Sequence, residues 1–67
     1  MARSMSRTLA VEIADRVLAV VNPANRRLAL GEALRRHGFP GAELGDGGIL
    51  SDRQRLIDWL RETYGRD

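Results

Sequence analysis

The stretch over residues 37–51, HGFPGAELGDGGILS, limits the fold more than any other feature of the sequence. It holds five of the seven glycines in the chain and one of the two prolines. Glycine and proline interrupt regular secondary structure, whereas the segments on both sides have apolar residues at helical spacing. The stretch therefore predicts a long connection between helices, over residues 38–50. It contains neither GxGxxG nor GxxxxGK[ST], so it does not match a phosphate-binding loop.

Apolar residues at helical spacing predict three helices, over residues about 8–21, 23–37 and 52–64. The residues expected to face the core are Leu9, Ile13, Val17 and Val20 in the first helix, Leu30, Ala33 and Leu34 in the second, and Leu56, Ile57, Leu60 and Tyr64 in the third. No segment has strand-like alternation. We therefore predict an all-α fold, a small three-helix orthogonal bundle over residues 8–65 that follows a flexible tail over residues 1–7.

The boundaries of the second helix are well marked. Asn22 precedes Pro23, and a residue before proline is driven out of the helical region, so the first helix should end there. The same pair can start the second helix, with Asn22 as N-cap and Pro23 at the first helical position. Gly38 suits the left-handed position after a helix, and Phe39 can pack back on Leu34.

Hydroxyl side chains predict the other two helix starts. Ser6 or Thr8 can cap the first helix, because either oxygen can accept a hydrogen bond from a free amide. Ser51, followed three residues later by Gln54, predicts a capping box at the third helix. Asp52 adds negative charge to the first turn of that helix.

Composition excludes several kinds of chemistry. The chain has 67 residues, one histidine and no cysteine, so disulfides, thiolate zinc sites and cysteine catalysis are excluded. His37 has no predicted catalytic partner, and the chain is too short for a buried pocket. We therefore expect no enzyme activity, no metal or other cofactor and no small-molecule substrate. No apolar stretch approaches the roughly 20 residues of a membrane span, and we expect a cytoplasmic protein.

Charge leaves two functions open. All eleven basic residues are arginines, which indicates a GC-rich, bacterial or phage genome, and the nine carboxylates reduce the formal net charge to +2. Our leading hypothesis is a protein–protein docking module, or a self-associating one. Its expected binding residues are Val11, Leu18, Arg35, Arg36 and Trp59. The broad apolar stripe of the first helix and the interface preference of tryptophan favour this hypothesis.

The alternative is a small DNA-binding regulator of phage, antitoxin or nucleoid type. It would contact phosphates through Arg26, Arg27, Arg35, Arg36, Arg53 and Arg55. Carboxylates at helical spacing predict competing local pairs, among them Glu12 with Arg16 and Glu32 with Arg36. Arginines on one face would favour DNA binding, whereas scattered and paired arginines would favour docking. Outside the arginines, residues 42–48 are the expected place for a recognition surface.

Residues 34–60 resemble the peripheral subunit-binding domain of 2-oxo acid dehydrogenase complexes. The matching elements are a basic helix that ends in glycine (residues 35–38), a Gly-Gly-apolar element (47–49) and a capped second helix (51–52 at its start). The segment is also similar to the DNA-binding domain of actinobacterial nucleoid-bridging proteins. That family reads DNA with an Arg-Gly-Arg loop, where this chain has Asp46-Gly47-Gly48. The resemblance implies a helix–loop–helix shape.

Overall fold

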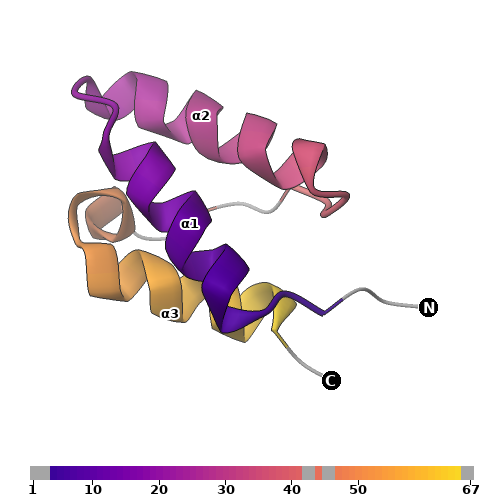
Figure 1. The fold of residues 1–67 in the computed structure, drawn as a ribbon. Coiled ribbons are helices and arrows are strands. Elements are labelled where there is room, and N and C mark those ends of the chain that lie inside the picture. Colours follow the sequence, from indigo (N-terminus) through magenta and orange to yellow (C-terminus); the bar gives the residue numbers. More distant parts are fainter. Residues whose placement is uncertain (1–3, 42–43, 45–46, 66–67) are drawn as a thin grey trace.

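Three α-helices and one short 3₁₀ helix make up the computed structural model, which describes residues 4–41, Leu44 and 47–65. The α-helices are α1 (Arg7–Leu18), α2 (Pro23–Arg36) and α3 (Arg53–Tyr64), and the 3₁₀ helix is η1 (Gly47–Ser51) (Figure 1). The described residues contain no strand. The predicted all-α three-helix fold is therefore confirmed.

Helix α1 crosses between the other two helices. In Figure 1, α2 lies above α1 and α3 lies below it. Helix α1 packs on both, η1 packs on all three, and α2 and α3 do not pack directly on each other. The bundle is therefore joined through α1 on one side and through η1 on the other.

The core is aliphatic, with two aromatic rings at its edge. Its buried residues are Met5, Ala10, Ile13, Ala14, Val17, Leu30, Ala33, Leu34, Phe39, Leu50, Leu56, Ile57, Leu60 and Tyr64. No polar or charged residue among those described is buried. Burial of this apolar surface supplies the main driving force for folding.

Met5 corrects the predicted tail over residues 1–7. Its side chain is only 1% exposed and belongs to the core. Its backbone N–H donates to the carbonyl of Tyr64 at 2.8 Å, which fixes the segment before α1 against the end of α3. A single methionine has no periodicity, so helical spacing could not identify it as a core residue.

The predicted caps of α1 and α2 are confirmed. Ser6 Oγ accepts from the N–H of Leu9 at 3.2 Å, and Asn22 Oδ1 accepts from the N–H of Ala24 at 3.0 Å. Pro23 stands at the first position of α2. These groups satisfy amides that have no partner inside a helix.

Helix α2 ends at the position that Gly38 indicated in the sequence. Gly38 has a φ of 83°, in the left-handed region. Its N–H donates to the carbonyl of Arg35 at 3.1 Å, and the N–H of Phe39 donates to the carbonyl of Leu34 at 2.8 Å. This pair of bonds defines a Schellman motif.

Two predicted boundaries are wrong. Helix α1 ends at Leu18 rather than near Val21, and beyond its regular part the Arg26 guanidinium donates to the carbonyls of Leu18 and Val20. The cap of α3 is Asp52 rather than Ser51.

Asp52 caps α3 because its backbone is extended, whereas Ser51 before it still belongs to η1. Its carboxylate Oδ1 accepts from the N–H groups of Gln54 and Arg55, at 3.0 and 3.2 Å. Ser51 instead closes η1. The Gln54 side chain donates to Asp58 Oδ1 at 3.0 Å and forms no capping box.

Much of the predicted recognition segment over residues 42–48, including Asp46, lies outside the described residues. Of this segment, Leu44 is partly buried and packs against the core. No helix within the described part of the chain is long and apolar enough to cross a membrane.

Candidate docking groove between α1 and α2

Arg26, one of the six arginines proposed for DNA contact, bonds inside the protein. Its Nε donates to the carbonyl of Val20 at 2.6 Å, and its Nη1 donates to the carbonyl of Leu50 at 2.8 Å. A longer contact of 3.4 Å joins Nη2 to the carbonyl of Leu18. The guanidinium is partly buried and connects the end of α1, the start of α2 and η1, so its charge is directed at backbone dipoles.

Arg53, a second member of that set, pairs with Asp15. Nε of Arg53 lies 2.7 Å from Oδ1 of Asp15, and the pair joins α3 to α1. Both side chains are 54% exposed. The hydrogen bond from Arg53, helped by its charge, lowers the pKa of Asp15 below the ordinary range. The same bond and the charge of Asp15 raise the pKa of Arg53.

The remaining arginines of the DNA hypothesis are exposed on two helices that do not pack on each other. Arg27, Arg35 and Arg36 lie on α2, and Arg55 lies on α3. At 100° per residue, Arg27 and Arg36 are half a turn apart around α2. The six arginines therefore occupy separate environments rather than one continuous face.

The residues predicted to bind a protein partner are also separated. Val11, Leu18 and Trp59 are partly buried and pack against the core. Arg35 is exposed, and Arg36 lines a groove described below. The most exposed large apolar residues are instead Val21 and Leu28, at 89% and 68%, near the corner between α1 and α2.

Trp59 is held in an aromatic cluster. Its ring lies edge-on to Tyr64, with centroids 5.9 Å apart, and Tyr64 lies edge-on to Phe39 at 5.4 Å. The hydroxyl of Tyr64 donates to the carbonyl of Pro40, and burial raises the pKa of Tyr64. The cluster holds the chain after α2 against α3, so Trp59 contributes to the fold.

A groove runs between α1 and α2 and consists of two adjoining hollows. Arg16, Arg36 and His37 line both hollows, Glu12 and Ile13 line the first alone, and Val20, Ala29, Glu32 and Ala33 line the second alone. The floor is apolar and the rims are charged. No described residue of α3 or η1 contributes to the lining of either hollow.

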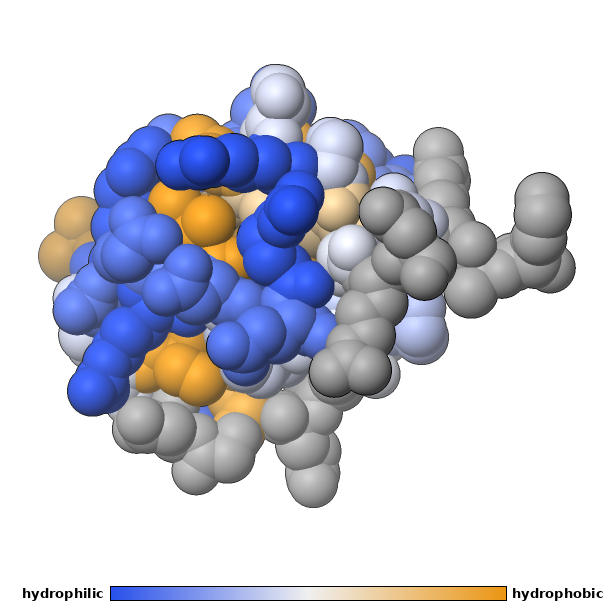
Figure 2. Space-filling view, turned by 90° about the horizontal axis from the view of Figure 1, so that it is seen from below, coloured by the Kyte–Doolittle hydropathy of each residue, from blue (hydrophilic) through white to orange (hydrophobic). Residues whose placement is uncertain are grey.

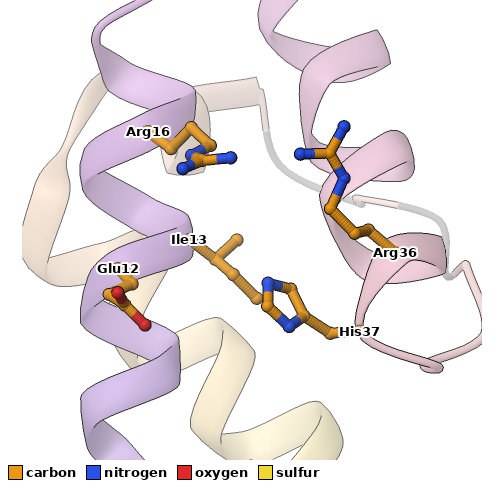
Figure 3. Close-up of a pocket in the computed structure, with 5 residues that line it drawn as sticks. All are labelled: Glu12, Ile13, Arg16, Arg36 and His37. Carbon is orange, nitrogen blue, oxygen red and sulfur yellow. The ribbon is translucent and has the colours of Figure 1, made fainter.

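The two helices place their charged side chains on opposite walls. Figure 3 shows Arg16 from α1 and Arg36 from α2 pointing toward each other, above Ile13 and His37. Glu12 points away from both guanidinium groups. Within the described part of the chain, neither Arg16 nor Arg36 forms an ion pair or a hydrogen bond through its side chain. The predicted pairs of Glu12 with Arg16 and Glu32 with Arg36 are absent.

A second groove lies between α1 and α3. It is lined by Arg7, Gln54, Ile57, Asp58 and Arg61. Asp58 is already engaged by the Gln54 amide. Figure 2 shows the molecule from below, the side on which α3 lies in Figure 1, and this face is mostly hydrophilic with smaller hydrophobic areas between. The groove between α1 and α2 has the more extensive apolar floor.

The sequence pattern did not identify Arg16 as a groove residue. The spacing of Glu12 and Arg16 indicated a local pair, whereas the approach of Arg16 to Arg36 depends on how α1 packs on α2. Searches against models of known protein families, curated proteins and solved structures find no match to this chain.

Proposed function

We propose that this protein is a non-enzymatic docking module that binds a helix of a protein partner in the groove between α1 and α2. The observation that carries the proposal is the groove itself, with an apolar floor between two charged rims. An amphipathic helix commonly binds in such a groove, with its apolar face on the floor and its polar residues at the rims.

The residues that line the groove support binding rather than catalysis. Among the described residues that line the groove there is no serine, threonine or cysteine that could act as a nucleophile. Small and aliphatic residues form the floor, where Val20 and Ala29 are partly exposed and Ile13 and Ala33 are buried.

The arrangement of the arginines supports docking over DNA binding. Arg26 and Arg53 are engaged within the protein. The exposed arginines lie on separate helices, which is a poor match to a continuous phosphate backbone. A DNA-binding protein of this size would be expected to present a single basic face.

Selection from a displayed library of helical peptides tests the proposal. Peptides enriched on the protein are measured against two variants at neighbouring positions of α2, Ala29→Arg and Leu28→Arg. Ala29 is partly buried and lines the groove, whereas Leu28 is exposed and does not. We expect Ala29→Arg to weaken binding at least about tenfold, equal to 1.4 kcal/mol, because its side chain obstructs the floor. Leu28→Arg should have little effect.

Three outcomes would overturn the proposal. The selection could enrich no peptide, the enriched peptides could bind Ala29→Arg as tightly as the wild type, or only Leu28→Arg could lose binding. Circular dichroism of both variants establishes that they fold. Duplex DNA provides the competing test, because phosphate contacts make log K fall by about 0.9 per neutralised phosphate as log salt rises. Tight DNA binding with such a slope would favour the DNA-binding function instead.

A further inference from the structure

We infer that the helix bound in this groove carries an Asp or Glu at its centre, held between Arg16 and Arg36, with a Lys or Arg about one turn away on each side. The inference rests on the proposed docking function and specifies the chemistry of the partner. It follows from the positions of four charged side chains along the groove.

The centre of the groove is positively charged. Arg16 and Arg36 line both hollows, so they mark the place where the two hollows meet. Figure 3 shows their guanidinium groups directed toward each other from opposite walls. Two facing cations repel, and an anion between them replaces repulsion with two attractive contacts. Arginine also offers carboxylates paired N–H donors, which give geometric specificity.

The two ends of the groove are negatively charged. Glu12 lines only the first hollow and Glu32 lines only the second. Along the groove the charge is therefore negative, positive, then negative. A polyanion such as nucleic acid would place phosphates against Glu12 and Glu32, whereas one carboxylate between two basic residues complements all four charges.

Helix geometry sets the expected spacing in the partner. Glu12 and Arg16 are four residues apart on α1, as are Glu32 and Arg36 on α2. Four residues of α-helix span about 6 Å. The partner should therefore carry the pattern basic, acidic, basic at positions i−4, i and i+4, with apolar residues beside the acid to cover the partly exposed Val20 and Ala29.

The peptides selected on the protein provide the probes. A synthetic copy of the tightest groove-dependent peptide is measured by titration calorimetry against Arg16→Gln, Arg36→Gln and the exposed neighbour Arg35→Gln. We expect each groove variant to weaken binding about tenfold and Arg35→Gln to leave it within about twofold. Replacing the central acid of the peptide by its amide should weaken binding to the wild type but have little further effect on the Arg16→Gln, Arg36→Gln double variant.

The outcomes separate the two proposals. If groove-dependent peptides show no acidic preference, or bind Arg16→Gln and Arg36→Gln as tightly as the wild type, the inference is overturned and the docking function stands. If no peptide depends on the groove, the docking function itself fails. Enrichment of peptides with several consecutive acidic residues would also contradict the inferred charge pattern.

Discussion

Single residues in this protein take their roles from partners distant in the chain. Asp15 and Arg53 are 38 residues apart and form an exposed ion pair between α1 and α3. Nothing local to either residue indicates the other. The sequence predicted Arg53 as a phosphate contact, and only the packing of α1 on α3 shows that its guanidinium has an internal partner.

Asp15→Asn is expected to lower the free energy of unfolding near neutral pH and to lose this effect in acid. Because Arg53 lowers the pKa of folded Asp15, the carboxylate contributes stability above its unfolded pKa of about 3.9. That contribution is lost as the pH falls through the lower pKa of the folded state. Urea unfolding from pH 7 downward should show the difference between wild type and variant shrinking below about pH 4.

Arg53→Gln serves as the matched variant. It removes the same ion pair from the other side. The double variant should therefore lose less stability than the sum of the two single losses, and about as much as either single variant. A difference between wild type and Asp15→Asn that stays constant down to the lowest pH would contradict this assignment.

At the scale of helices, local sequence determines most boundaries. Asn22, Pro23 and Gly38 act where the sequence predicted, because their effects depend on neighbours within a few residues. Ser51 and Asp52 show the limit of this reasoning. Both can cap α3, and the choice depends on η1, whose formation places Ser51 inside a 3₁₀ turn.

Replacement by alanine should have opposite effects at two glycines, Gly31 within α2 and Gly38 directly after its C-cap. Gly38→Ala should destabilise the protein by about 1–2 kcal/mol, because Gly38 has a left-handed φ that costs a residue with a Cβ that much. Gly31→Ala should stabilise it by about 0.5–1 kcal/mol, because Gly31 is helical and a Cβ there meets no atom within 4 Å. Thermal and urea unfolding measure both, and equal signs would refute the argument.

A comparison of Asp52→Ala with Ser51→Ala tests the corrected cap of α3. Asp52 accepts two backbone N–H bonds, so its loss should cost about 1 kcal/mol. Ser51 is exposed, and its replacement should change the free energy of unfolding by less than about 0.5 kcal/mol. A larger loss from Ser51→Ala would restore the capping box as the better description.

At the scale of the whole molecule, α1 and η1 hold together two helices that do not pack on each other. Arg26 contributes to this arrangement from the opening turns of α2, since it reaches carbonyls at the end of α1 and in η1. The open side between α1 and α2 is the groove. The same topology therefore produces both the internal role of Arg26 and the candidate docking surface.

Arg26→Lys should destabilise the protein by about 2 kcal/mol even though the charge is retained. Hydrogen bonds from charged groups contribute about 1.5–3 kcal/mol, and an ammonium group lacks the planar set of donors that reaches carbonyls of separate elements. The neighbouring Arg27→Lys is the control and should stay within about 0.5 kcal/mol, because Arg27 is exposed. Equal losses in the two variants would indicate that the carbonyl contacts contribute nothing specific.

Periodicity and capping residues predicted the helical class, the three helices and most of their ends, because these signals act over one or two turns. The packing of the helices on one another places Met5 in the core, gives Arg26 its internal bonds and sets Arg16 and Arg36 on opposite walls of one groove. Each of these depends on the packing of elements that are far apart in the chain. Local periodicity records which face of a helix is apolar, but it does not record which neighbour that face meets.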